Sequence, residues 1–156
     1  MSQTAVTHYA EHLSRQNAAV EAFVEVLHRE RDVLAARPVP MDQLSDVTET
    51  KSNQAAVLED MERTRRALAD AERADRGDLD DREIAERFGC RDLWAQLSMR
   101  VAEARTQNDI NGLAIQTRLD YTNRALGFLR RSAAQSLYAA DGQRRPSSQG
   151  RLRGGA

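Results

Sequence analysis

The sequence predicts an all-α protein, an elongated antiparallel bundle or coiled coil of three long helices plus one short helix. Its apolar residues recur every three or four positions over long stretches, which is the spacing of one face of a helix. Only 4% of its 156 residues are aromatic while 30% are charged, and the chain has just eight glycines and three prolines. β-sandwiches and β-barrels need β-branched and aromatic residues with frequent turns, so this composition argues against them.

The first predicted helix carries one apolar seam and ends before Pro38. Proline restricts the residue before it and lacks the amide hydrogen that would continue the helix, so the Pro38–Pro40 segment should stop it. The seam contains two polar members, Asn17 and Arg31. Its apolar members are Val6, Tyr9, Leu13, Val20, Val24, Leu27 and Leu34.

The second predicted helix begins with Asp42 as its N-cap and ends near Gly77, because glycine is the usual helix terminator. Its seam alternates steps of three and four residues. The polar residues Lys51, Gln54 and Arg65 interrupt it and would limit the stability of a self-associating coiled coil. Its remaining members are Leu44, Val47, Leu58, Met61 and Leu68.

A short third helix is predicted from a capping box. Asp80 can accept a hydrogen bond from the amide of Glu83, whose carboxylate can reach back, and Gly89 should close the helix. From Arg91 to about Leu137 there is no proline, so we expect one long helix of roughly 70 Å.

One domain followed by a tail is expected from this pattern. Residues 1–140 should form the helical domain, and residues 141–156 an Arg/Gly/Ser tail without periodicity, which we interpret as disordered.

The long helix has two apolar stripes. Together they present more apolar surface than the narrow seams of the first two predicted helices would cover. One stripe runs along the helix through Trp94, Leu97, Val101, Ala104, Asn108, Asn111, Ile115, Leu119, Leu126 and Leu129. The second lies only in the C-terminal half and consists of Ile110, Leu113, Tyr121, Ala125 and Phe128. Core packing of a bundle explains a wide stripe, whereas surplus apolar surface would mark a binding site.

No motif for catalysis, nucleotide binding or a metal protease occurs, so we expect no enzyme, no cofactor and no metal. His8 and His12 lie four residues apart but lack a third ligand. The single cysteine, Cys90, fits a reducing compartment and a small residue at a helix junction. Without a signal sequence or an apolar run of about 20 residues, a cytoplasmic protein without membrane insertion is expected.

Three segments together resemble the flagellar export chaperone FlgN family. The first is Asn108–Leu113, with the pattern N-x-x-N-G-φ in mid-helix. The second, Leu137–Gln143, resembles the family's L-Y-x-x-D-G segment, although Ala139 stands where the family more often has glycine. The third, Thr50-Lys51-Ser52, is similar to the family's E-K-S/T. The resemblance covers the chain from about Leu13 to Gln143.

The resemblance implies a cytoplasmic, non-enzymatic chaperone of the flagellar type III export pathway. Its partners would be the hook–filament junction proteins of the FlgK/FlgL type and the cytosolic domain of the flagellar export gate. The resemblance assigns Tyr138 to docking on the export gate and the helix before it to client binding. Together with the spacing of apolar anchors, it gives these client-binding candidates: Asn108, Asn111, Gly112, Leu113, Ile115, Leu119, Leu126 and Leu129.

Several alternatives remain open at this stage. Asn108 and Asn111 could set the helix register instead of contacting a client, and Gly112 could admit a close helix from the bundle or from the client. Tyr138 could cover the end of the bundle. The whole chain could be a self-associating structural coiled coil or adaptor. Nucleic-acid binding through the arginine tail is disfavoured, because the net charge is only −1.

Overall fold

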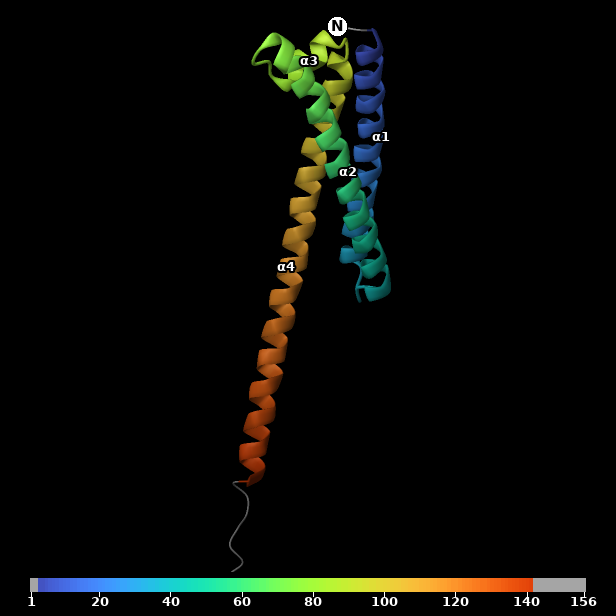
Figure 1. The fold of residues 1–156 in the computed structure, drawn as a ribbon. Helices are drawn as coiled ribbons and strands as arrows, with labels where there is room; N and C mark the ends of the chain where they lie inside the picture. The colour runs from blue at the N-terminus through green and yellow to red at the C-terminus, as the bar shows by residue number, and fades with distance from the viewer. Residues whose placement is uncertain (1–2, 142–156) are drawn as a thin grey trace, which may run out of the picture. The chain divides into compact units, whose positions relative to one another are not determined.

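The computed structural model describes residues 3–141, including all side chains except those of Gln3, Arg76 and residues 136–141. The described residues form helices and no strand, which confirms the all-α prediction. The helices, shown in Figure 1, are α1 (Gln3–Ala35), α2 (Met41–Arg76), α3 (Asp81–Arg87) and α4 (Arg91–Asp141). The chain divides into two compact units, Met1–Ile115 and Gln116–Ala156, with the division inside the sequence of α4.

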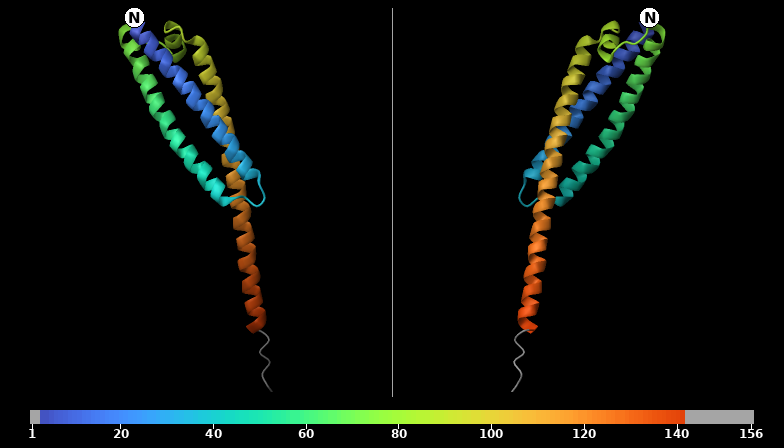
Figure 2. Two further views of the ribbon diagram at one scale, coloured as in Figure 1. Left: turned by 90° about the vertical axis from the view of Figure 1, so that its right-hand side faces the viewer. Right: turned by 90° about the vertical axis from the view of Figure 1, so that its left-hand side faces the viewer.

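In the first unit, α1 and α2 are antiparallel and lie side by side (Figures 1 and 2). Nε2 of His12, near the start of α1, is 2.8 Å from the carbonyl oxygen of Met61, far along α2. The first part of α4 runs in the same direction as α1. Asn17 donates to the carbonyl of Leu93 at 2.9 Å, and Asn111 donates to that of Leu27 at 2.8 Å.

The ends of α1 and α2 lie close to their predicted positions, with one correction. Asp42 is not the N-cap of α2; Pro40 is, in an extended conformation and without a side-chain capping bond. Asp42 lies in the first turn, where a carboxylate is still favoured by the helix dipole. The helix ends at Gly77, whose φ of +96° favours glycine and whose amide bonds the carbonyl of Arg73.

The capping box predicted for α3 is present. The Asp80 carboxylate accepts from the Glu83 amide at 2.8 Å, and the Glu83 carboxylate accepts from the Asp80 amide at 2.8 Å. The amides of Asp80 and Glu83, at the start of this seven-residue helix, are therefore satisfied by side chains. Gly89, at a φ of +67°, lies between α3 and α4.

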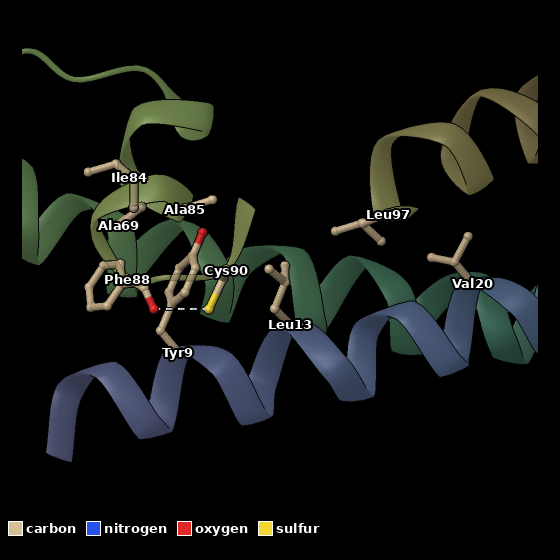
Figure 3. Close-up of a cluster of buried hydrophobic side chains, with 9 residues drawn as sticks. All are labelled: Tyr9, Leu13, Val20, Ala69, Ile84, Ala85, Phe88, Cys90 and Leu97. Carbon is tan, nitrogen blue, oxygen red and sulfur yellow. Dashed lines mark hydrogen bonds between the residues drawn. The ribbon is translucent and has the colours of Figure 1, made fainter. Parts of the chain in front are cut away.

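The main core of the first unit joins all four helices near the N-terminus of α1 (Figure 3). The rings of Tyr9 and Phe88 stack with centroids 4.4 Å apart. The Cys90 thiol donates to the carbonyl of Phe88 at 3.2 Å, and burial raises its pKa. Cys90 therefore serves as a small buried residue at the junction between α3 and α4. The full cluster is Tyr9, Leu13, Val20, Ala69, Ile84, Ala85, Phe88, Cys90 and Leu97.

In the second unit, the described residues belong to the remaining part of α4, which ends at Asp141, four residues beyond the predicted Leu137. No helix, over its described residues, is long and apolar enough to cross a lipid bilayer. The predicted tail lies outside the described residues apart from Asp141, whose backbone is helical.

Candidate functional site

Asn111, one of the client-binding candidates, is buried and forms hydrogen bonds inside the first unit. Its side chain is 1% exposed, and its amide nitrogen donates to the Leu27 carbonyl and to a Glu30 oxygen, both at 2.8 Å. Its amide oxygen accepts from Gln107 at 2.9 Å. These contacts fit the register-setting alternative, so Asn111 does not contribute to an exposed docking surface in this structure.

Asn111 belongs to a buried polar cluster that connects α1, α2 and α4. At its centre, the fully buried Glu30 accepts from Lys51 Nζ at 2.7 Å and from Asn111. Lys51, which interrupts the predicted apolar seam of α2, therefore forms an ion pair with α1 within the bundle. Glu30 lies off the predicted α1 seam, so periodicity gave no signal for it.

The other candidates in the first unit are more accessible. Asn108, Gly112 and Leu113 are exposed, and Ile115 is half-buried. A Cβ added to Gly112 would meet no atom within 4 Å, so the close approach of a bundle helix proposed for this glycine is absent from the structure. Within this unit, the eight-residue stretch 108–115 thus contains one buried residue, Asn111, two half-buried residues, Ala114 and Ile115, and five exposed ones.

The candidates in the second unit, Leu119, Leu126 and Leu129, are all exposed. Tyr121 and Phe128 are exposed on the same half of the helix, each two residues after a leucine, and Ala125, four residues from both Tyr121 and Leu129, connects the two rows. Exposed large apolar side chains are common singly, but a contiguous set on one face indicates a surface that another molecule covers.

Tyr138 lies in the last turns of α4, and its side chain lies outside the described residues. Its assignment to export-gate docking therefore rests on the resemblance to the family.

A groove that the sequence did not reveal lies in the first unit between α1, α2 and α4. Its volume is about 750 Å³, and both apolar and polar side chains line it. Small residues such as Ser52, Ala55 and Ser98 leave this space, and this was the only signal in the sequence. Its apolar lining consists of Val20, Phe23, Ala55, Leu58, Trp94, Leu97, Val101 and Ala104.

One end of the groove is held by Arg65, which is 2% exposed. Its guanidinium makes two hydrogen bonds of 2.9 Å to Glu62 and one of 2.9 Å to Asp81. It also lies over the ring of Trp94, 4.8 Å from the ring centroid. A single cation from α2 thus fixes α3 and α4 in place.

These contacts shift the acidities of both carboxyl groups. Burial alone would raise the pKa of Glu62, but hydrogen bonds from Arg65 and Arg66 lower it to about 2 from its ordinary 4.5. Asp81 follows the same pattern, because hydrogen bonds from Arg65 and Arg73 lower its pKa despite burial.

We predict from these shifts that the bundle loses stability in acid. Glu62 is protonated near pH 4.5 in the unfolded chain but only near pH 2 in the folded chain. Its contribution to the free energy of unfolding is therefore complete above pH 4.5 and is lost as the pH falls toward 2. Urea unfolding followed by circular dichroism across this range should show the decline. In Glu62→Gln the decline should be shallower, and an unchanged slope would contradict the assignment.

His8 and His12, which the sequence places four residues apart without a third ligand, gain none in the described part of the structure. Among the described residues, no three His, Cys, Asp or Glu side chains gather as they would around a metal ion. His12 is buried and lies against the Met61 carbonyl, which explains it as a packed residue.

Comparison with known proteins identifies the family. A family model described as FlgN protein matches residues 1–146. The chain belongs to the FlgN family. It is 28% identical to "Flagella synthesis protein FlgN" of Salmonella typhimurium over 145 residues, covering 93% of this chain and 96% of the relative.

Two further relatives within the FlgN family carry the same name. The Proteus mirabilis protein is 27% identical over 131 residues, covering 84% of this chain and 86% of that one. The Escherichia coli protein is 25% identical over 138 residues, covering 88% and 91%. No solved structure matches the chain.

Proposed function

We propose that this chain is a cytoplasmic flagellar export chaperone that binds hook–filament junction proteins of the FlgK/FlgL type and delivers them to the export gate. Membership of the FlgN family, whose relatives are named for flagella synthesis, supports a role in flagellar assembly. The observation that carries the binding role is the set of exposed apolar side chains on α4 beyond Gln116.

The surface has the chemistry that recognition of an amphipathic client helix requires. Such a helix buries apolar residues spaced three, four and seven apart against apolar anchors on its partner. Leu119 and Leu126 are seven residues apart, and Leu129 follows after three. A client helix held in this way keeps its own apolar face from aggregating until it is released.

Delivery is proposed to use a separate place on the chain. Tyr138 follows the client-binding anchors by nine or more residues, so its ring can serve a second partner while the client is bound. Tyrosine suits a single-residue anchor, because it combines a large apolar ring with a hydroxyl.

The test measures two affinities, for a junction protein and for the cytosolic domain of the export gate, with the native chain and with Tyr138→Ala. We expect the native chain to bind both. The variant should keep its client affinity and lose about 1–3 kcal/mol of gate affinity, the range of a modest aromatic hot spot.

Three outcomes would count against the proposal. Failure of the native chain to bind a junction protein removes the chaperone role. Unchanged gate binding by Tyr138→Ala removes this tyrosine from delivery. A lower melting temperature with weaker client binding in Tyr138→Ala would instead favour the role of a cover on the bundle end.

Self-association of the same apolar surface is the competing function. Light scattering of the chain alone and with the junction protein separates the two, because a coiled-coil adaptor forms larger species without any client.

A further inference from the structure

The apolar face of the second unit is bordered by positive charge. We define this face as Leu119, Tyr121, Ala125, Leu126, Phe128 and Leu129. From Gln116 to Ala156 the chain has eight arginines and two aspartates, although the net charge of the whole chain is only −1. The remainder of the chain is correspondingly acidic.

Helical spacing places one arginine at each edge of the apolar face. Arg130 follows Leu126 by four residues and borders the leucine edge. Arg124 follows Tyr121 by three residues and borders the aromatic edge. Asp120, the single acidic residue between 116 and 135, lies on the opposite side of the helix.

These arginines differ from Arg65, Arg73 and Arg100 of the first unit, which form ion pairs. In the part of the chain that the structure describes, Arg124 and Arg130 form no ion pair, and both are exposed. In coiled coils, charged residues that flank the apolar seam form salt bridges between helices and so determine which helices pair. Arg124 and Arg130 flank the apolar face in the same way.

Resting on the proposed client-binding function, we infer that the occupant of this face is an acidic amphipathic helix. Its apolar seam packs on the leucines and aromatic residues, and its flanking Asp or Glu side chains pair with Arg124 and Arg130. Recognition is then selective for the charge that flanks the client's apolar seam.

An anionic membrane surface would also attract arginines, but the face itself argues against that occupant. Arg118 is seven residues before Ala125 and so lies in the middle of the apolar face. A helix lying in a bilayer would bury this position among acyl chains, where a guanidinium is costly. A partner helix can instead offer it a carboxylate.

The test uses two synthetic helices of about three heptads with the same leucine and isoleucine seam, one flanked by glutamate and one by lysine. Each is titrated against the full-length chain by fluorescence anisotropy. We expect the glutamate-flanked helix to bind at least about tenfold more tightly. The preference should shrink as salt rises from about 0.05 M to about 0.5 M, because exposed pairs are screened.

The charge-reversed variant Arg124→Glu/Arg130→Glu should invert the order of the two helices. The matched control is Arg15→Glu/Arg29→Glu, which makes the same change in net charge at two exposed α1 positions of the first unit. The control should keep the native preference. If the control also inverted the order of the two helices, the preference would come from the net charge of the whole protein and not from Arg124 and Arg130. That result would overturn the inference.

Equal binding of both helices, or a native order that survives in Arg124→Glu/Arg130→Glu, would also overturn it. So would tight binding to vesicles of anionic lipid together with no binding to either helix. Adding a junction protein separates this failure from that of the proposed function. If the junction protein binds and charge has no effect, only the inference fails, whereas selective helix binding without junction-protein binding contradicts only the proposed function.

Discussion

A Leu126→Glu variant should lose detectable binding to junction proteins while keeping the melting transition of the bundle. Placing a carboxylate against an apolar client surface costs at least about 3 kcal/mol, which weakens affinity more than a hundredfold. Leu126 is 46% exposed and belongs to the second unit, so the core of the first unit does not depend on it. Leu119→Glu should behave in the same way. Isothermal titration with the junction protein and thermal circular dichroism provide the two measurements.

The matched control is Met99→Glu, which places the same charge at an exposed apolar residue of α4 in the first unit. Met99→Glu should bind the client as the native chain does. If Leu126→Glu and Leu119→Glu melt early as well as losing binding, these leucines support the fold and the assignment of the client surface is wrong.

A Lys51→Met variant should lower the free energy of unfolding by about 3–5 kcal/mol, the usual cost of leaving one member of a buried ion pair without its partner. The carboxylate of Glu30 is fully buried, and Lys51 is the cation that neutralises it, at 2.7 Å. Methionine keeps the apolar stem of lysine, so the variant removes the charge with little change in packing. Urea unfolding monitored by circular dichroism measures the loss.

Two controls make this measurement specific. Arg63→Met breaks the exposed ion pair with Asp60 and should cost no more than about 1 kcal/mol. The double variant Lys51→Met/Glu30→Gln removes both charges and should recover part of the stability, because the amide oxygen of glutamine can still accept from Asn111. A Lys51→Met variant as stable as the native chain would show that the pair contributes nothing.

Local sequence signals predicted most of the fold. The prolines at 38 and 40 separate α1 from α2, the glycines at 77 and 89 follow the ends of α2 and α3, and the Asp80–Glu83 capping box is complete within four residues. Each of these devices acts through neighbouring backbone atoms, so one sequence suffices to recognise it. The N-cap of α2 was missed because Asp42 has the residue type of a cap but lies two residues after the actual cap, Pro40.

The contacts between helices were harder to predict. Periodicity identified the faces that carry Lys51 and Arg65 but not the carboxylates that they meet, Glu30 and Asp81, which lie on other helices. Long cationic side chains reach partners that a seam pattern does not encode. The same limit applies to Asn108 and Asn111, which share a stripe in the sequence but differ in the structure, one exposed and the other buried.

The surroundings of two reactive groups determine how this protein can be labelled. Lys51 is the single lysine of the chain and Cys90 its single cysteine. The amine of Lys51 is held in the ion pair with Glu30, and the Cys90 thiol is buried with its pKa raised, so little of it is nucleophilic thiolate. A cysteine introduced at Ala134, an exposed position of the second unit, would therefore carry a fluorophore with little background from the native thiol.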